Sequence, residues 1–173
     1  MYENFSILMK EGHENEAPTI DNIRGIVVPL ITGKQFLLLP KYEFRKLLDQ
    51  SATEEQLIYW KTQDEWDALY DEGLIDKTDV LARAGSPAAL YVRKYGMDLP
   101  NLQMLAAIMQ NRRKINEVAS EIKGADEINS GSYYWPCCRY GTDVAWIANG
   151  NLGFFSNSYF CSTYLAAPVA LLP

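Results

Sequence analysis

The C-terminal segment from Tyr133 to Pro173 constrains the fold more than any other part of the sequence. Its apolar residues fall into the short runs YYW, VAWIAN, LGFF and YLAAPVALL, with Gly-, Asn- and Ser-rich stretches between them. Apolar runs of this length, bounded by turn-forming residues, are typical of β-strands. We therefore expect the segment to supply the strands of an antiparallel sheet.

The same segment differs from the rest of the sequence in composition. The last Met is Met109, the last Gln is Gln110, the last Lys is Lys123 and the last Glu is Glu127. Apart from Trp135 and Trp146, every residue type in the segment can be encoded by a codon that ends in a pyrimidine, and none of the four missing types can. We interpret the segment as a binding surface whose composition is set by how its gene is varied.

The upstream sequence predicts a hairpin followed by helices. IRGIVVPLI (23–31) and QFLLLP (35–40) are apolar and β-branched or aliphatic, with Thr-Gly-Lys between them, so we expect two paired strands. The pattern of Phe44, Leu47 and Leu48 predicts a helix over 41–50, and helical spacing continues over 54–75 and 78–85.

Two further helices carry clear end signals. PAALYVRKYG (87–96) has proline at its start and glycine at its end, which is the favoured polarity of a helix. Asn101 is placed to cap a helix over 102–122, with Asn111 or Asn116 marking a kink or a second start. Helices in the middle and strands from both ends predict an α+β fold. We expect a polar leader over 1–21 and a single domain over 22–173.

Composition excludes several classes of function. The 173 residues are 48% hydrophobic and 22% charged, with a net charge of −6. An acidic protein lacks the clustered cations that neutralise phosphates, so we expect no nucleic-acid partner. No apolar run is long enough to cross a bilayer, and the N-terminus lacks a signal-peptide pattern. We therefore expect no membrane insertion and a cytoplasmic or virion-associated protein.

Catalytic and metal-binding constellations are also missing. The single histidine is His13, and the cysteines are Cys137, Cys138 and Cys161, which do not have zinc-site spacing. The acids between Asp64 and Glu72 lack the alternate spacing of a calcium loop and indicate a solvated helix face. We expect no metal, no cofactor and no enzymatic activity.

Several motifs at consistent intervals resemble the C-type-lectin-like domain of bacterial and phage variable proteins, which is related in fold to formylglycine-generating enzymes. The matching residues are Leu99-Pro100, Tyr134-Trp135, Ala145-Trp146, Gly153 and Pro168-Val169. Met97-Asp98, Met104 and Ala167 depart from the family pattern of an aromatic, an acid and an arginine. The resemblance covers most of the sequence from Ile23 and implies a C-type-lectin-like fold, with an N-terminal hairpin, central helices and C-terminal antiparallel strands.

The tail also resembles the targets of diversity-generating retroelements, in which a template is copied inaccurately into the 3′ end of a gene. This resemblance implies a variable region over about 133–173, with scaffold residues held between varied ones. The scaffold residues are Tyr134, Trp135, Ala145, Trp146, Gly153, Pro168 and Val169. The expected ligand-contacting residues are Pro136, Cys137, Cys138, Arg139, Tyr140, Gly141, Thr142, Asp143, Ile147, Asn149, Asn151, Phe155, Asn157, Tyr159, Phe160, Cys161 and Thr163.

These expectations describe a ligand- or receptor-binding protein with a diversified surface, whose partner is a protein or a glycan. The first alternative is a structural subunit that forms homo-oligomers or joins a phage tail through its polar N-terminal arm and apolar C-terminus. The second is an enzyme of the formylglycine-generating type that uses its cysteines as a redox set.

Overall fold

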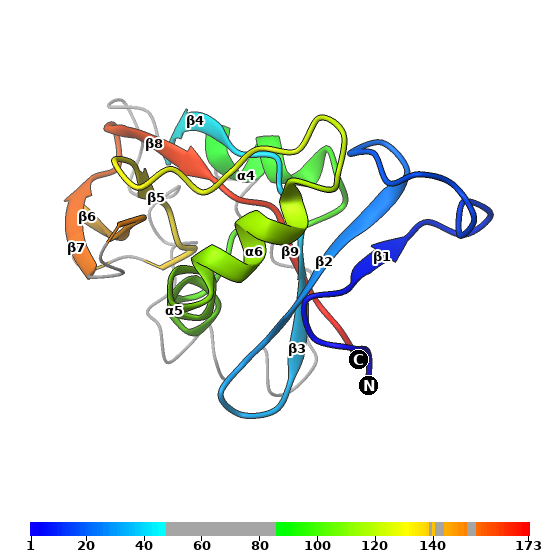
Figure 1. Cartoon of the computed structure of the whole chain (residues 1–173). Coiled ribbons are helices and arrows are strands. Elements are labelled where there is room, and N and C mark those ends of the chain that lie inside the picture. The colour runs from blue at the N-terminus through cyan, green and yellow to red at the C-terminus, as the bar shows by residue number, and fades with distance from the viewer. Residues whose placement is uncertain (48–85, 139, 141–143, 152–154) are drawn as a thin grey trace.

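Strands from both ends of the chain form the first of two sheets. The computed structural model describes residues 1–47, 86–138, 140, 144–151 and 155–173. The first sheet consists of β1 (Ile7–Met9), β2 (Ile23–Pro29), β3 (Gln35–Leu38) and β9 (Val169–Leu171), paired antiparallel in that order. The predicted hairpin is confirmed as β2 and β3, in which Val28 lies opposite Phe36 (Figure 1).

The second sheet carries most of the C-terminal segment. Its strands, in spatial order, are β4 (Glu43–Lys46), β8 (Thr163–Ala166), β5 (Tyr133–Tyr134), β6 (Val144–Asn149) and β7 (Phe155–Tyr159). The expected strands are present, but β5 and β8 are parallel where they meet at Tyr134 and Leu165. The prediction of purely antiparallel strands is therefore wrong for this pair, because β8 lies on the far side of β5 instead of folding back beside β7.

The predicted helix over 41–50 is wrong where the structure describes it. Residues 43–46 form β4, which pairs with β8 along its whole length, and Phe44 lies opposite Leu165. Backbone hydrogen bonds to a neighbouring strand outweigh the weak local preference for a helix. The helices expected over 54–75 and 78–85 lie outside the described residues.

The two helices with clear end signals are confirmed. Helix α4 (Pro87–Arg93) begins at Ser86, whose hydroxyl accepts a hydrogen bond from the Ala89 N–H. Helix α5 (Leu102–Gln110) begins at Asn101, whose side chain accepts from the Met104 N–H. At Asn111 the helical path breaks, and α6 (Arg112–Ala119) follows.

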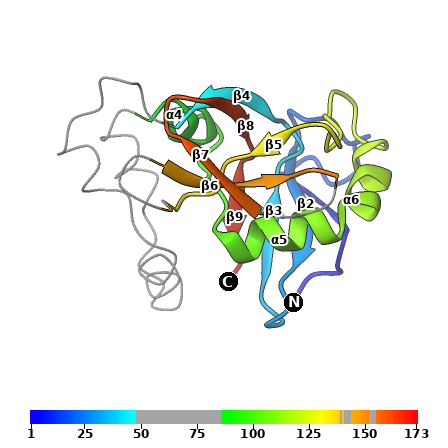
Figure 2. The ribbon, with the colours of Figure 1, turned by 90° about the vertical axis from the view of Figure 1, so that its left-hand side faces the viewer.

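The helices join the two sheets around one hydrophobic core. Helix α5 contacts both β2 and β6, α6 contacts β2, and α4 contacts β4 and β8 (Figures 1 and 2). The largest fully buried side chains include Trp135, Tyr134 and Phe36, which come from both sheets. The α+β class is therefore established, and the end strand β7 lies at the edge of the second sheet.

The polar N-terminal segment is part of the first sheet. Strand β1 pairs with β2, and the Tyr2 N–H donates to the side-chain oxygen of Gln35 at 2.9 Å. The Leu172 N–H donates to the Gln35 backbone oxygen, so this buried residue ties both ends of the chain to β3. Both termini lie at the same end of the molecule (Figure 1). Strand β1 and Tyr2 thus connect the N-terminal segment to the first sheet.

Candidate functional site

The β6–β7 hairpin places several of the predicted contact residues on one face of the second sheet. Residues directly opposite each other on antiparallel strands point to the same side. Trp146 lies opposite Asn157, and Val144 lies opposite Tyr159. Phe155, two residues before Asn157, has the same orientation because side chains alternate along a strand.

On this face the ring of Trp146 contacts two other aromatic rings. The Tyr140 and Trp146 ring centroids are 4.7 Å apart with planes at 88°, and those of Trp146 and Phe155 are 6.4 Å apart at the same angle. Edge-to-face contacts of this kind stabilise a pair by about 0.5–1.5 kcal/mol beyond the area they bury. Tyr140 is 55% exposed and Tyr159 60% exposed. We call Tyr140, Trp146, Phe155 and Tyr159 the aromatic face.

The hairpin that carries the aromatic face is fixed from its base. The Gly150 N–H donates to the Ser132 oxygen at 2.9 Å. The Arg112 guanidinium, at the start of α6, donates to the backbone oxygens of Gly150 and Asn151. The backbone of Gly150 is so close to the Asn129 oxygen that an added Cβ would lie 2.1 Å from it. Glycine at this position therefore allows the hairpin to dock against the loop before β5.

The structure separates the predicted contact residues by exposure. The exposed ones are Tyr140, Asn151, Asn157, Tyr159 and Thr163, and the partly buried ones are Asn149, Phe155 and Cys161. The expected positions Arg139, Gly141, Thr142 and Asp143, together with the scaffold residue Gly153, lie outside the described residues. Within the described part, Phe155, Asn157 and Tyr159 lie on the same face of the sheet as Trp146, whose ring contacts that of Tyr140.

Five of the predicted contact residues lie in the core and not on the surface, so the prediction is wrong for them. Pro136, Cys137, Cys138, Ile147 and Phe160 are all buried. The Cys137 N–H donates to the Pro100 oxygen at the start of α5, so this part of the segment enters the interior next to the helix. Ile147 faces inward because it alternates with Trp146 along β6. Buried side chains cannot contact a ligand in this conformation.

The buried cysteines lack the properties of reactive thiols. The Cys137 and Cys138 sulfurs are 4.0 Å apart, and both side chains have no exposed surface. Burial raises the pKa of Cys137 well above its ordinary value, and the hydrogen bond with Cys138 raises it further. A thiol is nucleophilic as the thiolate. Burial therefore disfavours the thiolate form that a redox reaction of these cysteines would need.

The predicted scaffold residues are mostly internal. Tyr134, Trp135, Ala145, Pro168 and Val169 are buried. The Trp135 indole N–H donates to the Arg45 oxygen at 2.8 Å, and its ring lies 5.0 Å from that of Tyr164. Burial raises the pKa of Tyr134 to about 12. Trp146 differs, because it is partly buried against the core and also contributes to the aromatic face.

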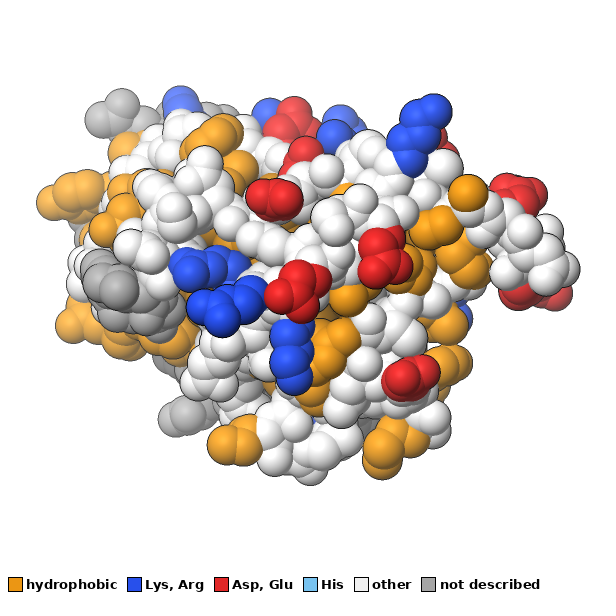
Figure 3. All heavy atoms as spheres, viewed as in Figure 1, with side chains coloured by type: hydrophobic (Ala, Val, Ile, Leu, Met, Phe, Trp, Pro, Cys, Tyr) orange, Lys and Arg blue, Asp and Glu red, His pale blue; other side chains and the backbone are white. Residues whose placement is uncertain are grey.

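A basic cluster borders the hairpin. Arg112, Arg113 and Lys114 begin α6, and together with Asn151 they line a hollow of about 520 Å³. In Figure 3 blue side chains gather near the start of α6 and others lie along the top, and orange side chains lie at the left-hand edge, where Figure 1 places β7. Within the described residues, no group of three His, Cys, Asp or Glu side chains could hold a metal ion. Nor is any helix in the described part long and apolar enough to span a membrane.

Sequence reasoning missed the residues that position the hairpin. Arg112 reads in the sequence as one member of a polar helix face, and Gly150 as an ordinary turn residue in ANGNLG. The sequence of a hairpin does not reveal which backbone atoms from other parts of the chain will approach its glycine. Glycine between two asparagines is the one local signal for such a contact.

No model of a protein family matches the sequence, and no curated protein matches it either. Among solved structures, the fold is similar to that of a fimbrial protein from Bacteroides ovatus, with a TM-score of 0.60 and 13% sequence identity. The match covers 97% of this chain and 48% of the other, so the chain spans about half the length of that protein. At this identity the likeness concerns the fold alone.

Proposed function

We propose that the protein binds a ligand or receptor through the aromatic face and has no enzymatic activity. The observation that carries the proposal is the set of contacting rings at the edge of the second sheet, with Tyr140 and Tyr159 more than half exposed. Aromatic side chains supply a large contact area at low cost in conformational entropy, and they are enriched where proteins bind partners. Asn157 adds hydrogen-bonding groups among them.

We further propose that the scaffold is a C-type-lectin-like domain and that a diversity-generating retroelement varies its surface. Two features support this proposal. Tyr140, Phe155, Asn157 and Tyr159 can all be encoded by pyrimidine-ending codons, whereas the partly buried Trp146 between them cannot. Substitutions at the four outward positions would change the face and leave the buried residues of β5 and β6 untouched. The burial of Cys137, Cys138 and Ile147 restricts the proposed variation to outward positions.

Binding by the aromatic face can be tested with matched variants. A Tyr140→Ser/Tyr159→Ser double variant removes the two most exposed rings, and Phe44→Ser is the control. Phe44 is 54% exposed and lies on β4, at the opposite edge of the same sheet. We expect a glycan array or purified surface proteins of a host cell to bind the wild type and the control alike, and the double variant at least tenfold less. Equal binding by all three proteins would refute the aromatic face as the site.

The retroelement proposal has an independent test in the gene. We expect pyrimidine-ending codons at Tyr140, Phe155, Asn157 and Tyr159, and a nearby near-copy of the segment with AAY codons at those positions. Purine-ending codons in related genes at the same positions, or the absence of a near-copy, would contradict the proposal. Neither result would bear on binding by the aromatic face.

A structural subunit of a surface or virion assembly is the second candidate. It is suggested by the fimbrial protein of similar fold. The edge strand β7 presents a row of backbone groups that a neighbouring strand can pair with. The two candidates differ in the effect of concentration, because an assembly subunit forms larger species as it is concentrated. A protein that stays monomeric in sedimentation experiments at high concentration would argue against this candidate.

A further inference from the structure

A second hollow lies on the first sheet, away from the hairpin. It has a volume of about 320 Å³ and sits between β2, β3 and β9 and the turn that follows α4. This volume is at the lower end of the range for pockets that hold small molecules. The lining residues are Lys10, Ile20, Ile23, Arg24, Leu37, Leu39, Lys94, Tyr95, Gly96, Met97 and Ala170. None of these residues belongs to the aromatic face.

The floor of the hollow is apolar because of how the sheet is built. Leu37 and Leu39 are two residues apart, so their side chains point to the same face, and Ala170 of β9 lies directly opposite Leu37. Leu37, Leu39 and Ile23 are at most 3% exposed. The small side chain of Ala170 leaves the space above the sheet open, where a larger residue would fill it.

The turn after α4 forms one wall. The Gly96 N–H donates to the Arg93 oxygen and the Met97 N–H donates to the Val92 oxygen, a pair of bonds that ends a helix around a left-handed glycine. Gly96 has a φ of +67°, as this ending requires. The turn directs Met97 into the interior and leaves Lys94 and Tyr95 exposed at the mouth.

The mouth of the hollow is cationic. Lys10, Arg24 and Lys94 come from three different segments of the chain, and no carboxylate lines the hollow with them. In the described part of the chain, no carboxylate pairs with any of the three. Three cations that have no carboxylate partner among the described residues give the mouth a positive potential, which favours an anion there.

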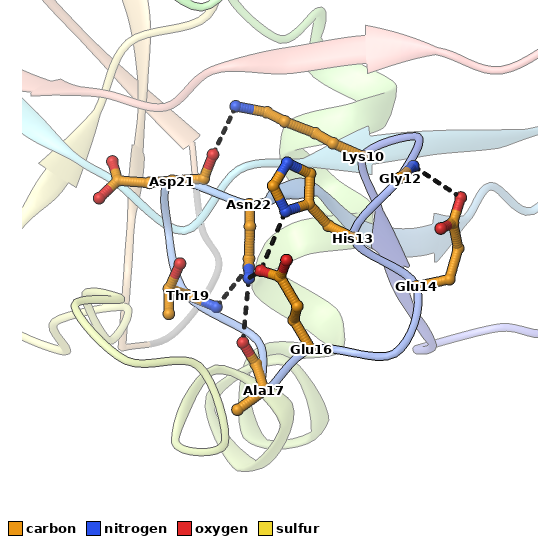
Figure 4. A network of polar contacts seen from close by, with 9 residues as sticks. All are labelled: Lys10, Gly12, His13, Glu14, Glu16, Ala17, Thr19, Asp21 and Asn22. Carbon is orange, nitrogen blue, oxygen red and sulfur yellow. Dashed lines mark hydrogen bonds and ion pairs between the residues drawn. The ribbon is translucent and has the colours of Figure 1, made fainter.

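The position of Lys10 is fixed without neutralising its charge. Its ammonium donates to the Asp21 backbone oxygen at 2.7 Å, and Figure 4 shows the Asp21 carboxylate directed away from it. The surrounding loop is held by Asn22, whose amide donates to Glu16 and to the Ala17 oxygen. The Lys10 ammonium therefore keeps donors for a further acceptor.

We propose that this hollow is a binding site for a small amphiphilic carboxylate. The acid group would lie at the mouth among Lys10, Arg24 and Lys94, and the hydrocarbon part would lie against Ile20, Tyr95 and Ala170, which line the hollow and are at least partly exposed. Cations at the mouth favour the carboxylate over a neutral head group, and the apolar floor favours a hydrocarbon tail over a hydrophilic anion. The site is separate from the aromatic face and does not depend on the proposed ligand-binding function.

Octanoate is the probe for the test, with octanol and acetate as matched probes that lack the charge or the tail. We expect octanoate to bind the wild-type protein with one-to-one stoichiometry in calorimetry, and octanol and acetate at least tenfold more weakly. An Arg24→Gln/Lys94→Gln variant is expected to weaken octanoate binding at least tenfold, since charge-assisted hydrogen bonds are lost. Arg113→Gln, an exposed position on α6, is the control and should bind as the wild type does.

A second variant tests the location of the tail. Ala170→Phe places a ring in the space above Leu37, and we expect it to abolish octanoate binding while the circular-dichroism spectrum stays unchanged. Should this variant fail to fold, the charge variant at two exposed positions still decides the question. Failure of octanoate to saturate the wild type at millimolar concentrations, or equal binding by the charge variant and its control, would overturn the proposal. Neither result would change the expectation that the Tyr140→Ser/Tyr159→Ser variant loses glycan or receptor binding.

Discussion

The two tryptophans of the C-terminal segment differ in environment, and this difference predicts unequal effects of removing them. The resemblance to retroelement targets implies that both are scaffold residues. In the structure Trp135 is fully buried and donates a hydrogen bond to the Arg45 oxygen. Trp146 is partly buried between the rings of Tyr140 and Phe155.

The expected magnitudes follow from burial. Trp135→Ala leaves a cavity and an unpaired carbonyl group, so the free energy of unfolding should fall by about 3–5 kcal/mol. Trp146→Ala removes two edge-to-face contacts and part of a buried surface that solvent can refill, so we expect a fall of about 1–2 kcal/mol. Trp135→Phe keeps much of the apolar surface and loses the hydrogen-bond donor. Its loss in the free energy of unfolding should therefore lie between those of Trp146→Ala and Trp135→Ala.

Urea unfolding followed by far-ultraviolet circular dichroism measures these differences without using tryptophan emission. With an m-value of about 2 kcal/mol/M, the midpoint should fall by about 1.5–2.5 M for Trp135→Ala and about 0.5–1 M for Trp146→Ala. The Trp146 variant should keep its fold and lose ligand binding. Equal midpoints for the two alanine variants would refute the distinction between a core tryptophan and one that contributes to the aromatic face.

Three further predictions concern the hairpin, the thiols and the buried tyrosines. Gly150→Ala should destabilise the protein by about 2 kcal/mol or more, because its Cβ would lie 2.1 Å from the Asn129 oxygen. Gly131→Ala, in the loop before β5, is the matched control in thermal unfolding, because the nearest atom to its added Cβ is 3.5 Å away. One thiol, Cys161, should react with a disulfide reagent in the native protein and three in urea, since Cys137 and Cys138 are buried; three fast thiols in the native state would contradict this. Burial raises the pKa of Tyr134 to about 12, above its unfolded value near 10, so the folded state holds the proton more tightly and stability should fall as pH rises from about 10 to 12. Absorbance titration of tyrosinate with Tyr134→Phe as the reference measures this, and a native Tyr134 that ionises near pH 10 would refute it.

The elements that sequence predicts best are those whose signals are local. Pro87 suits the first turn of a helix, where the backbone N–H has no partner within the helix, and the Asn101 side chain can accept from one of the first N–H groups. The structure places α4 and α5 where these residues indicate. The strand β4 was missed because its stability comes from β8, which lies more than a hundred residues away in the sequence. Local spacing of Phe44 and Leu47 carries no information about such a partner.

The candidate site was predicted less well than the fold, for a related reason. Composition marks the whole C-terminal segment as unusual, and it therefore gives the same weight to Cys138 and Tyr140, which lie two residues apart. The structure separates them, because Cys138 has no exposed surface and Tyr140 is 55% exposed. Exposure depends on which parts of the segment pack into the core, and composition does not report that.

A hairpin at the edge of a sheet can combine a stable core with a changeable surface because its two faces have separate roles. On β6 the inward side chains of Ala145 and Ile147 pack into the core, and Trp146 between them points to the opposite side. Asn157, which lies opposite Trp146 on β7, is exposed to solvent and is not part of the core. Substitution of Asn157 should therefore cost less than about 0.5 kcal/mol of stability. This freedom ends at Trp146 and Phe155, because both side chains pack against the core and their rings contact each other, while Trp146 also contacts Tyr140. At positions with both roles, binding and stability cannot vary independently.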